Sequence, residues 1–201
     1  MSDVFKTITS TSNGIYKEKG SKFLAFAIPV LSADEVKEFV KNFRKEYYDA
    51  RHVCYAYMLG AERTDFRTND DGEPSGTAGR PILGQINSRE LTNVLVIVVR
   101  YFGGILLGTG GLTTAYKEAA ADALNQSEII EKTVDIKISI LFEYILMNDV
   151  MHIIKESNAQ ILHQLFDNQC SMQLSIPKHD ENQFISKLNK IIGLVIEIEH
   201  I

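Results

Sequence analysis

One block of the chain, residues 94–116, constrains its fold more than any other. Its first six residues, Val94–Val99, are apolar and mostly β-branched, which predicts a strand buried on both faces. Five glycines follow within a short span, at positions 103, 104, 108, 110 and 111. Apolar residues then recur at helical spacing, which predicts a helix over 112–126. We therefore expect a strand, a glycine-rich loop and a helix in direct succession.

Such a loop can present backbone N–H groups at a helix N-terminus, where the helix dipole also favours an anion. Known nucleotide motifs do not fit it. Thr109 stands where a P-loop needs lysine, and Glu128 and Glu131 follow the helix without the second strand of a dinucleotide fingerprint. The alternative is that the glycines only allow positive φ and close packing. The sequence leaves both interpretations open.

The composition is that of a soluble globular protein of one or two domains, with 201 residues, 45% hydrophobic and 23% charged. The net charge of −5 is uneven, about −1 over residues 1–130 and about −4 over 131–201. All seven arginines lie at or before Arg100. Contact with nucleic acid would therefore need a local basic patch in the first half.

The cysteine pattern and the lack of a secretory signal predict a cytoplasmic protein. Cys54 and Cys170 are far apart and form neither a disulfide framework nor a zinc motif. The first residues lack the pattern of a secretory signal, and no apolar tract reaches 18 residues. We expect no membrane contact.

The sequence predicts two domains, 1–132 and 133–201. In the first, Ser32 and Glu35 form a capping box at the start of a helix, and residues 60–79 read as a long polar loop. The other predicted elements of this domain are a hairpin of Ile15–Lys19 and Lys22–Val30 around Gly20-Ser21, a strand Arg51–Leu59 and a short helix Thr77–Ile86.

The second domain is expected to have the βαββαβ order of a ferredoxin-like fold. Its predicted strands are Ile136–Phe142, Gln160–Phe166, Ser171–Ile176 and Leu194–Glu199, and its predicted helices are Leu146–Ser157 and His179–Ile192.

Acidic residues in the polar loop suggest a metal site only weakly. Asp65, Asp70, Asp71 and Glu73 offer oxygen ligands for Mg²⁺ or Ca²⁺, but their spacing is not that of an EF-hand. We expect no metal, and a solvated loop with Asx-turns instead. Two other catalytic patterns are equally weak. Ser75 lacks the spacing of a nucleophile elbow. His52 and Cys54 share a strand face and could pair as base and thiolate, although a buried cysteine is usually a small hydrophobe.

Cations and aromatic residues gather in sequence near the glycine loop. Arginine forks bind phosphate and aromatic rings stack on unpaired bases, so the set fits single-stranded or looped RNA. The candidate binding residues are Arg51, His52, Arg80, Arg100, Tyr101, Phe102, Gly103, Gly104, Gly108, Thr109, Gly110, Gly111 and Lys117, with Asp70, Asp71, Glu73 and Ser75 as the far wall. In the alternative, Arg80 and Arg100 pair with acids of the loop and merely fix it in place.

Three segments carry a family resemblance. Asp49–His52, Asp70–Pro81 and Arg100–Leu112 resemble the signature of the IMPACT/YigZ family, over nearly the whole chain. The resemblance implies an α+β fold in which the first domain is like domain IV of elongation factor G and the second domain of the fifth small-subunit ribosomal protein. The C-terminal domain would be similar to domain V of that factor. Thr114 departs from the lysine or arginine of many relatives.

The resemblance implies a regulator of translation rather than a known reaction, since eukaryotic IMPACT is such a regulator. The leading hypothesis is a non-catalytic cytosolic protein, without cofactor, that binds RNA or a ribosomal particle through its first domain. One alternative is an enzyme that holds a phosphorylated ligand or nucleotide in the glycine loop, with Mg²⁺ on the acidic loop. Another is that the C-terminal domain recognises a protein partner. No catalytic residue is assigned.

Overall fold

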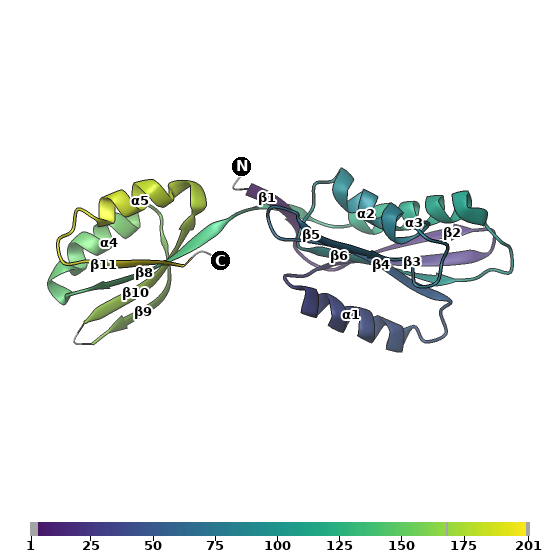
Figure 1. Ribbon diagram of the computed structural model, residues 1–201, viewed down its shortest axis with the longest axis horizontal. Coiled ribbons are helices and arrows are strands. Elements are labelled where there is room, and N and C mark those ends of the chain that lie inside the picture. The colour runs from purple at the N-terminus through teal and green to yellow at the C-terminus, as the bar shows by residue number, and fades with distance from the viewer. Residues whose placement is uncertain (1–3, 168, 200–201) are drawn as a thin grey trace. The chain divides into compact units, whose positions relative to one another are not determined.

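The computed structural model describes residues 4–167 and 169–199. The chain divides into two compact units, one formed by Phe5–Lys132 and the other containing the chain from Thr133 onward. We describe each unit by itself (Figure 1). The outermost residues of the predicted domains, 1–3 and 200–201, lie outside the described residues.

The first unit is built on an antiparallel five-stranded sheet with the order β2-β3-β6-β4-β5. Its central strand β6 is buried from Val94 to Arg100, which confirms the strand predicted from the apolar run. The strands are β2 (Ser12–Glu18), β3 (Ser21–Pro29), β4 (His52–Leu59), β5 (Asp65–Asn69) and β6 (Val94–Tyr101).

Helices cover both faces of this sheet. The helix α1 (Ala33–Glu46) lies on one face, and α2 (Gly79–Ser88) and α3 (Gly108–Asn125) lie on the other (Figure 1). Side chains alternate between two cores along β4, where Cys54 packs toward α2 and α3 and Val53 toward α1. The sheet is therefore apolar on both faces.

The predicted hairpin and capping box are both present. The strands β2 and β3 pair through Glu18 and Ser21, so the turn consists of Lys19 and Gly20, one residue before the predicted position. Both turn residues have positive φ, as the type I′ turn of a two-residue hairpin requires. The Ser32 side chain accepts a hydrogen bond from the Glu35 N–H at 3.2 Å and caps α1.

Two predictions for exposed segments are wrong. The strand β5 lies inside the predicted polar loop and pairs with β4 at the sheet edge. The strands β1 (Val4–Ile8) and β7 (Ile129–Thr133) form a two-stranded sheet where the sequence predicts no strand. Most side chains of β5 and β7 are exposed. Because an exposed strand buries no face, its sequence lacks the alternation on which the prediction relies.

The second unit has the predicted element order, β8-α4-β9-β10-α5-β11, and its sheet is antiparallel with the order β11-β8-β10-β9. Both helices cover one face of the sheet (Figure 1) and enclose a core that includes Phe142 and Phe184. The elements are β8 (Asp135–Phe142), α4 (Met147–Glu156), β9 (Gln160–Phe166), β10 (Cys170–Pro177), α5 (Glu181–Leu188) and β11 (Val195–Glu199). The helix α5 is shorter than predicted at both ends: a 3₁₀ turn precedes it at Lys178–Asp180, and it ends at Leu188 instead of Ile192.

In the part of the chain that the structure describes, no helix is long and apolar enough to cross a membrane.

The close approach of β2 to α3 gives the first testable prediction. A Cβ atom on Gly14 would lie 2.2 Å from the backbone nitrogen of Ala123. We expect Gly14→Ala to lower the free energy of unfolding by about 1–3 kcal/mol, because the strand and helix must separate. Urea unfolding measures this change.

The matched control is Gly84→Ala inside α2, where an added Cβ meets nothing within 4 Å. There the helix propensity of alanine should raise the free energy of unfolding by up to about 1 kcal/mol. Equal effects of the two substitutions would contradict the packing argument.

Candidate functional site

The acidic loop, residues 70–79, is fixed in place by its own carboxylates. The Asp70 carboxylate accepts hydrogen bonds from the backbone N–H groups of Gly76, Ala78 and Gly79, at 2.8, 3.0 and 2.8 Å. Two of these donors open α2, so Asp70 caps that helix from outside it. Burial by itself raises the pKa of Asp70, but the three N–H donors and the nearby Arg80 outweigh it and lower the pKa.

Asp71 attaches the same loop to β4. Its carboxylate accepts a hydrogen bond from the Val53 N–H at 2.7 Å and forms a 2.5 Å ion pair with Arg44. Its backbone carbonyl lies 2.7 Å from His52 Nδ1. The Asn69 side chain accepts from the Asp71 N–H at 2.8 Å, which is the predicted kind of Asx-turn.

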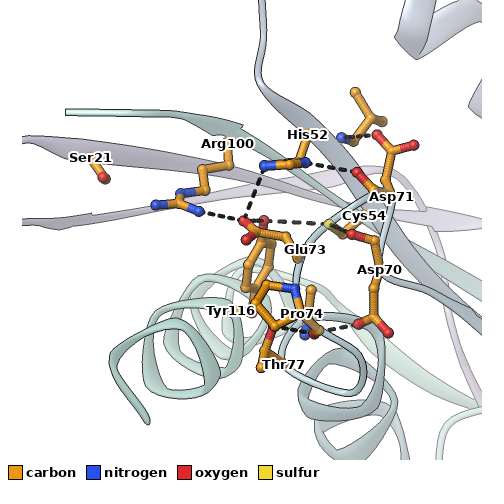
Figure 2. Close-up of polar contacts among 12 residues, drawn as sticks. Ser21, His52, Cys54, Asp70, Asp71, Glu73, Pro74, Thr77, Arg100 and Tyr116 are labelled. Atoms are coloured by element: carbon orange, nitrogen blue, oxygen red, sulfur yellow. Dashed lines mark hydrogen bonds and ion pairs between the residues drawn. The ribbon is translucent and has the colours of Figure 1, made fainter. Parts of the chain in front are cut away.

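Glu73 is the buried centre of the site (Figure 2). Its Oε1 atom lies 2.5 Å from Arg100 Nη1 and accepts a 2.7 Å hydrogen bond from the Tyr116 hydroxyl. The side chains of Glu73 and Arg100 are 3% and 6% exposed. This network joins the acidic loop to β6 and α3. The alternative in which Arg100 pairs with an acid of the loop is therefore confirmed, with Glu73 as the partner.

The Arg100 guanidinium also lies between two aromatic rings. Its Cζ atom is 5.5 Å from the ring centroid of Phe23 and 5.7 Å from that of Phe102, both within the range of cation–π attraction. Among the described residues, Nη1 is the guanidinium nitrogen of Arg100 that takes part in a hydrogen bond, and the buried Nε has no partner. Arg100 thus keeps donors unused in spite of its burial.

Cys54 and Tyr116 complete the buried part of the site. The Cys54 thiol donates to the Asp70 carbonyl at 3.1 Å and to the Tyr116 hydroxyl oxygen at 3.4 Å. Burial is the main reason why the pKa of the Cys54 thiol and that of the Tyr116 hydroxyl are both raised. A base and thiolate pair of His52 and Cys54 is therefore not supported, because the thiol stays protonated.

A cleft of about 440 Å³ opens beside this network. It is bounded by the start of β4, the acidic loop, the end of β6 and the first turn of α3. The residues that line it are Arg51, His52, Glu73, Pro74, Arg100, Phe102, Leu106, Leu107, Gly108, Thr109 and Leu112. His52 Nε2 lies 3.8 Å from Glu73 Oε1.

The helix α3 begins at Gly108, four residues before the predicted start. Gly110 and Gly111 therefore lie inside its first turn. Positive φ occurs at Gly104 and Gly108 and not at Gly110 or Gly111, so the need for positive φ applies to only part of the glycine-rich loop. The residue before the helix, Leu107, offers no side-chain cap, and the first turn contains no acidic residue. Within the described part of the chain, its N–H groups thus have no side-chain acceptor.

The cleft unites part of the predicted site. The predicted residues that line it are Arg51, His52, Glu73, Arg100, Phe102, Gly108 and Thr109. Three others have different surroundings: the Tyr101 hydroxyl donates to Asp49 at 3.0 Å, Gly103 packs against Gly20, and Lys117 lies beside Glu118. Arg80 packs near Gly76. The remaining predicted residues outside the cleft lining are Asp70, Asp71, Ser75, Gly104, Gly110 and Gly111.

Sequence reasoning missed two groups of residues at this site. In the sequence, Tyr116 counts only as one of the apolar residues whose spacing predicts a helix. A buried tyrosine hydroxyl usually has a polar partner, which is the signal that could have placed it at the site. Leu106 and Leu107 lie between Gly104 and Gly108, and Leu106 is 82% exposed. An apolar pair inside a glycine-rich loop is the sequence signal that could have indicated an apolar part of the site.

Comparison with known proteins shows a family model and several relatives that this chain matches. Residues 19–124 match the family model of the Impact N-terminal domain. The chain is 33% identical to the IMPACT family member YigZ of Escherichia coli (strain K12), over 85% of this chain and 84% of that protein. It is 30% identical to the IMPACT family member YvyE of Bacillus subtilis (strain 168), over 82% of this chain and 76% of that protein.

Two further matches extend the comparison. Protein IMPACT of Rattus norvegicus is 32% identical over 45% of this chain and 30% of its own length. A solved structure described as the crystal structure of an hypothetical protein superposes with a TM-score of 0.74 at 28% identity, over 100% of this chain and 98% of that one. The fold and site thus define an α+β protein with an Impact N-terminal domain. The chain belongs to the IMPACT family.

The Arg100–Glu73 pair gives a prediction for stability. We expect Arg100→Ala to lower the free energy of unfolding by about 3–5 kcal/mol, because Glu73 is left buried without its counter-charge. Guanidinium unfolding measures the change. Arg67→Ala, at an exposed position on β5, should change it by less than about 0.5 kcal/mol. An equally mild effect of both substitutions would show that the pair does not hold the loop.

The lowered pKa of Asp70 gives a prediction for pH. In the folded chain the pKa lies below 3.8, so the unfolded chain binds a proton first as the pH falls. The stability that Asp70 contributes is fully present above that value and is lost as the pH falls through the folded pKa. Asp70→Asn should be less stable at neutral pH and lose less stability below about pH 4. Parallel stability profiles of the two proteins would contradict this.

Proposed function

We propose that this chain is a regulator of translation that acts by binding RNA or a ribosomal particle through the cleft of its first unit. One observation carries the proposal: the cleft combines cationic side chains, an exposed aromatic ring and the uncapped start of α3. Membership of a family that includes eukaryotic IMPACT proteins supports it. The protein would act by occupying a site on its target rather than by catalysing a reaction.

The chemistry of the cleft suits an unpaired stretch of RNA. Arg51 is an exposed cation at its rim, and Phe102 is 46% exposed. A guanidinium can bind phosphate oxygens in a forked geometry, while an aromatic face can stack on any unpaired base. Stacking of this kind needs bases outside a duplex, so loops, bulges and ends of RNA are the targets that the cleft favours.

The acids near the cleft do not oppose an anionic partner strongly. Glu73 is paired with Arg100, and Asp71 with Arg44. Asp70 is surrounded by backbone N–H donors. With these charges compensated, Arg51 remains as a cation without an ion-pair partner among the described residues. An RNA phosphate would meet a weakly positive surface.

The alternative of a Mg²⁺-dependent enzyme requires free carboxylates in the acidic loop, and the structure does not show them free. It needs Asp70, Asp71 and Glu73 as metal ligands, whereas these carboxylates bind backbone N–H groups and arginines. Within the described residues, no group of three or more His, Cys, Asp or Glu side chains is arranged to hold a metal. The geometry therefore favours the binding function over this one.

A protein partner of the second unit stays a prediction. Leu165 of β9 and Val195 of β11 are 57% and 53% exposed on its sheet. Both align with Leu141 and Ser171 in one row across the four strands.

Sedimentation with ribosomal particles tests the proposed function. We expect the protein to co-sediment at low salt and to be released as salt rises, because phosphate contacts displace counterions. Arg51→Ala should reduce the slope of log affinity against log salt concentration by about 0.7. Arg67→Ala, the same change at an exposed arginine outside the cleft, should leave the slope unchanged. Binding that is absent at low salt, or that does not depend on salt, would contradict the proposal.

A further inference from the structure

The buried guanidinium of Arg100 has a donor without an acceptor among the described residues. A guanidinium offers five N–H donors in a planar fork, and buried donors in proteins normally have acceptors. Arg100 is 5% exposed, yet the hydrogen bonding of its guanidinium within the described residues is confined to Nη1, and the buried Nε has no partner. The side chain lines the cleft. This arrangement points to an acceptor that the chain itself does not supply.

The first turn of α3 supplies a second, independent set of donors. The other two long helices of the first unit are capped, α1 by Ser32 and α2 by Asp70. The start of α3 has no side-chain cap and no acidic residue, and Gly108 and Thr109 line the cleft. A Cβ atom added at Gly110 would meet nothing within 4 Å, so the approach to these N–H groups is open. Helix N-termini of this kind bind phosphate and other anions.

The apolar side of the cleft limits the ligand further. Phe102 is half exposed, and Leu106 and Leu112 lie on the same wall. A cleft of about 440 Å³ has the size of a small-molecule site rather than a channel for a polynucleotide. The Phe102 ring offers a face on which an aromatic base can stack, and Arg51, Arg100 and the α3 N–H groups are the donors available to its phosphate.

We propose that the cleft binds one nucleotide through a terminal phosphate monoester, as at the phosphorylated end of an RNA chain. A monoester has three free oxygens for the three sets of donors, whereas an internal phosphodiester has two. The inference rests on the proposed function where it concerns RNA. It adds that the protein selects an end of the chain and not only its unpaired bases.

The test measures binding of the full chain to short single-stranded RNAs of one sequence. One carries a 5′-phosphate, one a 3′-phosphate, and one hydroxyl groups at both ends; fluorescence anisotropy gives each affinity. We expect one phosphorylated RNA to bind at least about tenfold more tightly than the hydroxyl form, since charge-assisted hydrogen bonds are at stake. The two phosphorylated RNAs distinguish which end is recognised. Equal affinities for all three would overturn the inference.

A substitution at the start of α3 locates the site without removing a buried charge. Thr109→Asp places a carboxylate among the free N–H groups, which suits the helix but repels a phosphate. It should abolish the preference for the phosphorylated RNA. Thr114→Asp makes the same change at an exposed position of α3 outside the cleft and should keep the preference. A preference that survives Thr109→Asp would overturn the assignment to this cleft.

Nucleoside 5′- and 3′-monophosphates and the free nucleoside separate the two proposals, with thermal unfolding as the readout. Stabilisation by a monophosphate and not by the nucleoside, lost in Thr109→Asp, would support the cleft as a nucleotide site even if no RNA bound, and the proposed function would then fail alone. Salt-dependent RNA binding without any preference for a phosphorylated end would leave the proposed function standing and overturn the inference.

Discussion

The buried ion pair of Arg100 and Glu73 is the interaction on which the candidate site depends. It joins the last buried residue of the central strand β6 to the acidic loop, and Tyr116 adds α3 through the same carboxylate oxygen. Desolvation of two charges is expensive, so such a pair contributes little net stability compared with apolar residues. The pair matters instead because it specifies one arrangement. A single unpaired charge in this interior would cost far more free energy than the pair does. The strand β6, the acidic loop and α3 must therefore meet so that the two charges are together.

The packing around the pair explains why the arginine can remain short of hydrogen bonds. Phe23 and Phe102 lie within cation–π distance of its guanidinium, so two ring faces replace part of its lost hydration. Phe102 is at the same time a wall of the cleft. The ring that lies within cation–π distance of the buried cation thus also forms part of the cleft surface.

The sequence predicts well where burial is periodic and poorly where contacts are long-range. The strand β6 and the cap of α1 follow from local patterns, because their apolar and capping residues are adjacent in the chain. The strand β5 does not, since an exposed edge strand needs no apolar face. From the sequence, several acids of the loop are equivalent candidates for the partner of Arg100. The actual partner, Glu73, is 27 residues away from Arg100 in the chain. Only the folded loop, with Asp70 and Asp71 already engaged, determines which acid is left for the arginine.

The hydrogen bonds of Asp70 and Asp71 have a further consequence for how the protein moves. These two neighbouring carboxylates hold the N–H groups of Val53, Gly76, Ala78 and Gly79, which belong to β4, the acidic loop and the start of α2. Both acids lie on the same short stretch of chain, so a displacement of that stretch disturbs the contacts with all three segments. Slow opening events that expose amides to exchange with solvent would therefore release the strand, the loop and the helix start together, as one cooperative unit.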